Sequence, residues 1–131
     1  MSEPGPYDYA VVRAVPRIDR EEFTNVGVLV FARTRGFLGA RFDADAAIAA
    51  RVHALAAAAD VAAILTRLRA IAAVSRGDAE AGPIAALPAP ERFRWLVAPR
   101  STVVQCSVVH AGWCADPAAT LAHLFTALVA R

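Results

Sequence analysis

Apolar and polar positions in the first third of the chain follow the patterns that β-strands show. Residues 7–15 are mostly β-branched or aromatic and predict a strand that ends at Pro16. Residues 25–32 are apolar on both faces, which is typical of a central strand covered on both sides. After a turn at residues 33–36, residues 37–42 return as the antiparallel partner. The sequence therefore predicts a hairpin in which the strand at 25–32 is paired on both edges.

Beyond Asp43 the apolar period changes to that of amphipathic helices. Asp43 or Asp45 is placed to cap a first helix, and Asp60 is placed to cap a second. Two helices, or one helix over residues 44–74 broken near Asp60, fit the pattern equally well. The apolar stripes consist of Ile48, Val52 and Leu55, and then of Val61, Leu65, Leu68 and Ile71.

The last third of the chain alternates between irregular and regular segments. Residues 75–90 contain five Gly or Pro residues and predict a surface loop. Residues 91–97, with a proline before them, predict a short helix. Residues 102–109 are β-branched almost throughout and predict a strand, which a turn at 111–112 follows. Asp116 and Pro117 then begin a terminal helix, whose apolar side carries Leu121, Leu124, Phe125 and Leu128.

This order of elements predicts the α+β class, with an antiparallel sheet and helices packed mainly on one face. A chain of 131 residues has the size of one domain, so we expect a single α+β domain over residues 1–131. Gly27, inside the central strand, indicates close approach of another segment or of a ligand, and the first of these is favoured. The helix residues expected to face the sheet are Ile48, Val52, Leu55, Leu65, Leu68, Leu121, Phe125 and Leu128.

Composition excludes several classes of protein. With 57% hydrophobic and 20% charged residues, the chain is too apolar for a disordered protein. No apolar run approaches the roughly 18 residues of a membrane span, and the first residues do not form a secretory signal, so a cytoplasmic address is expected. All fourteen basic residues are Arg, as in proteins of GC-rich genomes, and the net charge of +2 indicates no nucleic-acid partner.

Four segments together are similar to a known family. They are residues 9–16 (YAVVRAVP), 22–30 (EFTNVGVLV), 93–102 (FRWLVAPRST) and 105–112 (QCSVVHAG). The chain resembles, over nearly its whole length, the bacterial family called domain of unknown function 3037. That family has no established activity to transfer to these residues. Its members are often encoded beside kinases that resemble HipA, and the resemblance therefore implies a HipA-like kinase as a possible partner.

Cys106, His110 and Cys114 are the best candidates for a metal site, because thiolate and imidazole suit zinc. The three residues lack the paired Cys-x-x-Cys spacing of zinc ribbons and fingers. We therefore favour ordinary packing of the cysteines and expect neither a metal nor another cofactor, with this trio as the alternative. Ser107 and His110 lie three apart on the predicted strand, hence on opposite faces, which argues against a hydrolase triad.

Arginine and glutamine side chains form the tentative binding site. Arg13 projects from an apolar strand face and needs a partner, a ligand or an open edge. Around the helix-to-strand junction, Arg92, Arg94 and Arg100 bracket Trp95, and Gln105 follows. Converging guanidinium groups would bind phosphate or carboxylate, whereas surface ion pairs with neighbouring glutamates are the plainer alternative.

No acid, base and nucleophile fall together on one predicted face. We therefore lean toward a non-catalytic binding or adaptor protein, which contacts a protein partner through the exposed aromatic and arginine surface around residues 93–100. The alternative is an enzyme or binding protein that acts on a phosphorylated or carboxylated small molecule through the arginine cluster. No membrane contact is expected.

Overall fold

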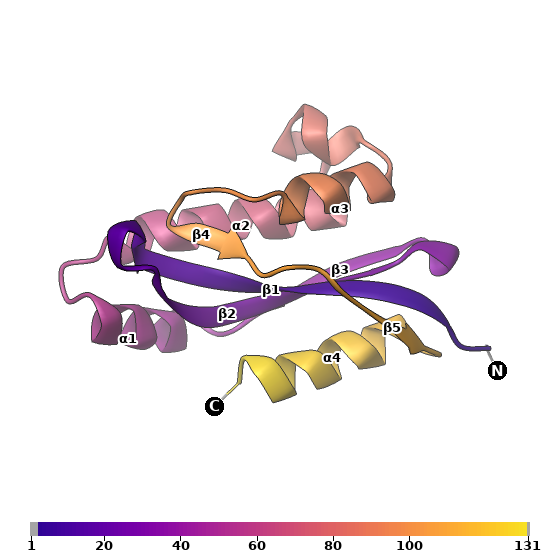
Figure 1. Cartoon of the computed structure of the whole chain (residues 1–131). Coiled ribbons are helices and arrows are strands. Elements are labelled where there is room, and N and C mark those ends of the chain that lie inside the picture. The colour runs from indigo at the N-terminus through magenta and orange to yellow at the C-terminus, as the bar shows by residue number, and fades with distance from the viewer. Residues whose placement is uncertain (1–2, 131) are drawn as a thin grey trace.

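A computed structural model describes residues 3–130 and shows a five-stranded antiparallel sheet with helices on both faces (Figure 1). The strands are β1 (Gly5–Arg17), β2 (Glu22–Ala32), β3 (Phe37–Phe42), β4 (Val104–Cys106) and β5 (His110–Cys114). The helices are α1 (Asp45–Leu55), α2 (Val61–Arg76), α3 (Ala89–Val97) and α4 (Pro117–Leu128). Four short 3-10 turns lie at Ile18–Arg20, Arg33–Arg35, Ala79–Ala81 and Pro83–Ala86. The predicted α+β class is confirmed.

The sheet order is β3-β2-β1, and β4 and β5 pair one after the other with the remaining side of β1. β2 pairs antiparallel with β1 and with β3, which confirms both the hairpin and the central position of this strand. Gly36, at φ 60°, ends the turn between β2 and β3. β1 is thirteen residues long, and this length gives room for two partner strands on its outer side.

Aromatic contact explains the glycine inside β2. A Cβ atom at Gly27 would clash with the ring of Phe42, its partner on β3, and would lie 3.0 Å from the carbonyl oxygen of Arg41. The expectation of close approach by another segment is confirmed. Beside it, Val26 has no partner on β1, because Val12 pairs with Gly27 and Arg13 with Asn25. This bulge changes which face the residues before it point to.

One face of the sheet carries the larger hydrophobic core, beneath α2 and α3 (Figure 1). Leu29 and Phe31 of β2 pack there, and Phe31 stacks on Phe93 of α3 with ring centroids 5.2 Å apart. The buried residues that the helices contribute are Ile48 and Val52 of α1, Ile64, Leu68, Ile71 and Val74 of α2, and Phe93 and Leu96 of α3.

α4 covers the other face, on the opposite side of the sheet from α2 and α3 (Figure 1). Phe125, with Val129 just past the end of α4, packs on Val28 and Val30 of β2. Helices thus pack mainly on one face, as expected, with one helix as the exception. The exception follows from β2, which is apolar on both sides and needs cover on both.

A polar network holds α1, β2 and the end of α4 together. Arg51 of α1 pairs with Asp43 at 3.0 Å and donates to the backbone oxygens of Asn25 and Val129. The amide of Asn25 in turn donates to the oxygen of Leu128 at 3.1 Å. Asp43 and Arg51 are both mostly buried, so losing one partner would leave the other charge uncompensated.

Two expectations about the ends of elements are wrong. The strand expected over 102–109 is limited to β4 at its centre, and the residues expected to turn at 111–112 belong to β5. Ser107 explains the break: its hydroxyl accepts from the N–H of Val11 and donates to the oxygen of Val108. A side-chain bond thus replaces one of the two backbone bonds between Ser107 and Val11. Gly112 allows the Tyr7 ring to lie against the backbone, where a Cβ would be 2.7 Å away.

The helix boundaries differ from expectation in smaller ways. Two helices span this region, which is one of the two alternatives that the pattern left open, and Asp60 caps α2 through the N–H of Ala63 as expected. Neither Asp43 nor Asp45 caps α1, whose N-cap is Ala44. Asp116 caps α4, as expected. β1 continues through Pro16, and α3 begins at Ala89, before the expected start.

The expected stripes are buried to different degrees. Ile48, Val52, Leu68 and Phe125 are buried, whereas Leu55, Leu65, Leu121 and Leu128 are half-buried. In α2 the fully buried residue is Ile64, so the inward face is turned by one position from Leu65. No helix within residues 3–130 is long and apolar enough to cross a membrane.

Candidate functional site

The arginines that bracket Trp95 in the sequence have separate roles. Arg100 lies over the Trp95 ring, 4.3 Å from its centroid, and donates to the backbone oxygens of Trp95 and Leu96. It therefore closes the end of α3, where carbonyl groups lack partners within the helix. Arg92 donates to the oxygen of Leu87 at 2.7 Å. Arg94 is exposed and lies 3.9 Å from Glu91.

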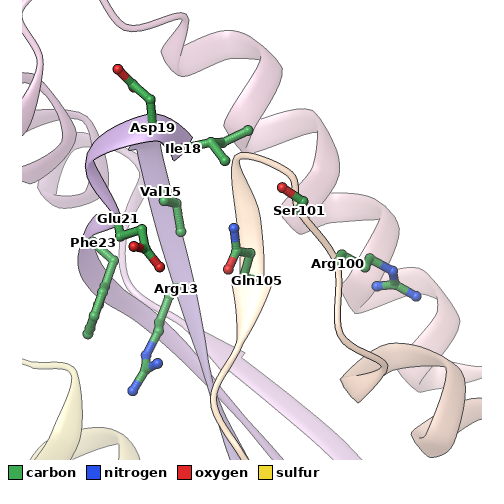
Figure 2. A pocket seen from close by; sticks show the side chains of 9 residues that line it. All are labelled: Arg13, Val15, Ile18, Asp19, Glu21, Phe23, Arg100, Ser101 and Gln105. Atoms are coloured by element: carbon green, nitrogen blue, oxygen red, sulfur yellow. The ribbon is translucent and has the colours of Figure 1, made fainter.

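Arg13 and Gln105 do lie together, as cross-strand neighbours on β1 and β4. They line a hollow of about 460 Å³ that also includes Phe23, Glu21 and Ile18 (Figure 2). Arg13, Glu21, Phe23 and Gln105 gather on one side of the strands, whereas the guanidinium group of Arg100 points away from them (Figure 2). Arg100 also lines the hollow, so the structure brings Arg13, Arg100 and Gln105 of the predicted set to one hollow. Arg92, Arg94 and Trp95 do not line it.

The stack of Arg13 on Phe23 is the main feature of this hollow. The guanidinium carbon lies 4.1 Å from the ring centroid, and Phe23 is 45% exposed. Asn25 is the neighbour of Arg13 on β2 and links the hollow to the end of α4 through its bond to Leu128. The hollow therefore lies on the α4 side of the sheet, next to the end of that helix.

The cysteine and histidine trio is divided between the faces of the sheet. Cys106 packs against the core beneath α2 and α3, opposite Val12. His110 pairs with Tyr9 and stacks on its ring at 5.1 Å, on the other face. Cys114 occupies the same face as His110, because positions 110 and 114 of β5 share one side. Among residues 3–130 no three His, Cys, Asp or Glu side chains are grouped to hold a metal ion.

Burial governs the chemistry of Cys106. Desolvation raises the pKa of its thiol to about 11, although Arg100 and Arg13 act in the opposite direction. The sulfur lies 3.4 Å from the oxygen of Leu96, so the thiol has a backbone partner. A thiol with this pKa is almost fully protonated at neutral pH and is a poor nucleophile.

The outer edge of the sheet, formed by β4, β5 and the link between them, is an exposed surface that sequence reasoning missed. Val108 is 74% exposed and Trp113 is 73% exposed, with Val109 also exposed. From Ser101 to Ala115 the chain contains no Asp, Glu, Lys or Arg. That uncharged run was the available signal, since edge strands are usually protected by charges.

Backbone groups on this edge differ between β4 and β5. Val15 donates to the oxygen of Val103, and Ser107 donates to Val11, so the odd-numbered residues of β1 bond toward the outer strands. In β4 the Thr102 hydroxyl bonds both the N–H and the oxygen of Val104. His110 and Gly112 of β5 lie opposite odd-numbered residues of β1 and therefore direct their N–H and C=O groups toward β1. Because these directions alternate along a strand, the N–H and C=O groups of Ala111 and Trp113 point outward. Within the described chain β5 pairs with no strand other than β1.

Comparison with known proteins gives one match. Residues 9–129 match the family described as "Protein of unknown function (DUF3037)". The chain belongs to this family. No curated protein and no solved structure matches the chain.

The DUF3037 match includes both surfaces described above. The hollow around Arg13 lies within residues 13–105, and the outer edge within residues 101–115. Residues 1–8 and 130–131 lie outside the matched range. The DUF3037 family description assigns no activity to either surface.

Proposed function

We propose that this chain is a non-catalytic protein-binding module, and that an extended segment of a partner protein pairs with β5 along the outer edge of the sheet. The observation that carries the proposal is the combination of outward backbone groups at Ala111 and Trp113 with an uncharged, exposed surface. Strand addition of this kind uses backbone hydrogen bonds for affinity and side chains for specificity.

The opposite edge of the sheet provides an internal comparison. β3 carries the exposed Arg41, and the turn before it contains Arg33 and Arg35. Charges of this type discourage pairing with another chain. β5 has no such charge, and its exposed Trp113 is of the residue type that contributes most at interfaces. The contrast favours the β5 edge as the binding surface.

Trp95 and Arg100 flank the same edge. A shallow hollow lined by Pro99, Arg100, Val108 and Val109 connects the end of α3 with the link between β4 and β5. Trp95 is 41% exposed and Arg100 is held against it. These two side chains would contact a segment that extends past β5, in line with the interface expected around residues 93–100.

An enzyme has less support. The high pKa of Cys106 makes its thiol unsuited to nucleophilic attack at neutral pH. The alternative of a phosphorylated or carboxylated small molecule bound by the α3 arginines is also disfavoured. Arg92 and Arg100 already donate to backbone oxygens.

The test uses the HipA-like kinase that the family resemblance implies, co-expressed with the tagged protein. Ala111→Pro removes one outward N–H, and an edge strand tolerates proline where the N–H faces solvent. We expect this variant to remain folded, and we expect the amount of co-purified kinase to fall at least tenfold. Ala111→Ser keeps the N–H and is the matched control, expected to recover the kinase as the wild type does.

Two results would contradict the proposal. One is equal recovery of the kinase with Ala111→Pro and with Ala111→Ser. The other is that the wild-type protein retains neither the kinase nor any other protein whose recovery depends on the N–H of Ala111. Circular dichroism of both variants establishes that the sheet is intact.

A further inference from the structure

The hollow around Arg13 contains two opposite charges that form no ion pair within residues 3–130, the half-buried Arg13 and the exposed Glu21. No hydrogen bond or ion pair is formed by the Arg13 guanidinium within residues 3–130, and its Nε is buried. Glu21 likewise takes part in no ion pair of the described chain. The other acidic residue of the hollow, Asp19, is neutralised by Arg17 at 2.7 Å, and the hydrogen bond from Arg17 lowers the pKa of Asp19.

Neighbouring side chains hold Arg13 in place. Phe23 supports one face of the guanidinium group, while Asn25 and Gln105 flank it on the neighbouring strands. The Nε of Arg13 is buried without a partner. Polar groups in such a position are usually satisfied by a bound group or by water, because leaving them unpaired is costly. A fixed guanidinium group recognises a carboxylate through two parallel hydrogen bonds.

Glu21 has an unusual backbone. Its φ of 55° is left-handed, and in the described chain every other residue with positive φ is a glycine. A side chain at this position strains the turn, so glycine would be the more stable choice. Strain of this kind tends to persist where the side chain has a use. The carboxylate of Glu21 lies on the same side of the strands as Arg13 (Figure 2).

We propose that this hollow binds a free amino acid with an apolar side chain. The α-carboxylate of the ligand pairs with Arg13, the α-ammonium group pairs with Glu21, and the side chain lies on Phe23 and Ile18. Arg13 and Glu21, a cation and an anion outside any ion pair, match a zwitterion, whereas Glu21 repels a phosphate or another multiply charged anion. The second cation that lines the hollow, Arg100, already donates to the backbone oxygens of Trp95 and Leu96. The volume of about 460 Å³ is within the range of small-molecule sites.

Calorimetric titration with L-phenylalanine and L-leucine tests the proposal. N-acetyl-L-phenylalanine lacks the ammonium charge, and L-phenylalaninamide lacks the carboxylate. We expect both derivatives, and inorganic phosphate, to bind at least tenfold more weakly than the free amino acid. Equal binding of the N-acetyl derivative, tighter binding of phosphate, or no binding of either amino acid would overturn the proposal.

Variants of two adjacent glutamates provide a matched pair. Glu21→Gly is expected to raise Tm, because glycine relieves the left-handed strain, and to lower affinity for the amino acid at least tenfold. Glu22→Gln changes the neighbouring carboxylate, which pairs with Arg20 outside the hollow, and is expected to leave affinity unchanged. Arg13→Lys keeps the charge but not the two parallel donors, and is expected to weaken binding as well. Unchanged affinity in Glu21→Gly would contradict the proposal, and its higher Tm excludes misfolding as the reason for a loss.

Discussion

Cys106 shows how burial decides the reactivity of a single residue. With its thiol pKa near 11, the folded protein holds almost no thiolate at pH 8. We predict that, in a Cys114→Ser variant with Cys106 as the one thiol, iodoacetamide labels the folded protein at least tenfold more slowly than the urea-unfolded protein at pH 8. Labelling is followed by mass spectrometry. Equal rates in the two states would show that the side chain is accessible and ionised.

The same shift has a consequence for stability. Folding raises the pKa of Cys106 from 9.0 to about 11, so the folded state keeps a proton that the unfolded chain loses. The associated stability is therefore fully present below pH 9 and is lost as the pH rises toward 11. A Cys106→Val variant lacks this loss, and the difference between the two urea titrations over that range measures it.

Glycines show where single residues could and could not be interpreted from the sequence. Gly27 interrupts a run of β-branched residues, so close approach by another segment was a sound prediction. Gly112 lies between an alanine and a tryptophan, and the sequence around it fits a turn as well as a strand. What places it in β5 is the Tyr7 ring, more than a hundred positions away in the chain. No local pattern contains that information.

At the level of elements, α2 presents a face that its apolar pattern indicates only approximately. Ile64 is fully buried and Leu65 is half-buried, although both are apolar and adjacent. We predict that Ile64→Ala lowers the free energy of unfolding by about 2–5 kcal/mol, as truncations in a core do. Leu65→Ala, the matched control on the same helix, is expected to cost less than half as much. Urea titration at pH 7 measures both.

An equal cost for the two variants would mean that α2 packs with the face centred on Leu65. The sequence could not distinguish these faces, because alanines fill many positions of the helix and leave several stripes of similar apolarity. The contacts of Ile64 and Leu68 with the sheet decide between them. By contrast, the cap at Asp60 is local and was predictable.

The outer strands show the same difference between local and distant information. β-branched residues from Thr102 to Val109 favour extended backbone, and extended backbone is what most of this segment adopts. Regular pairing ends at Ser107, because its backbone N–H donates to Val11 but its hydroxyl, in place of its backbone oxygen, accepts from the N–H of Val11. The position of that bond depends on the register of β4 against β1, which composition does not determine.

At the scale of the whole molecule, helices cover both faces of the sheet, and its β5 edge is left open. Cover on both faces was foreseeable from β2, whereas the choice of α4 for the second face depends on the order of the strands. Of the candidate site, Arg13 and Gln105 were predicted and do lie together. Trp113 and Glu21 were not predicted, because their importance depends on an edge and a backbone angle that only the fold creates.

Amide hydrogen exchange, measured with and without the HipA-like kinase that we propose as the partner, tests the central proposal most directly, since pairing at β5 must protect specific amides. In peptides that cover residues 108–115, we predict that the outward amides of Ala111 and Trp113 exchange at least tenfold more slowly in the complex than in the free protein. Peptides of the β3 edge, residues 33–42, are expected to exchange at the same rate in both. Protection of β3 or of the exposed side of α4, with unchanged exchange at β5, would contradict the account.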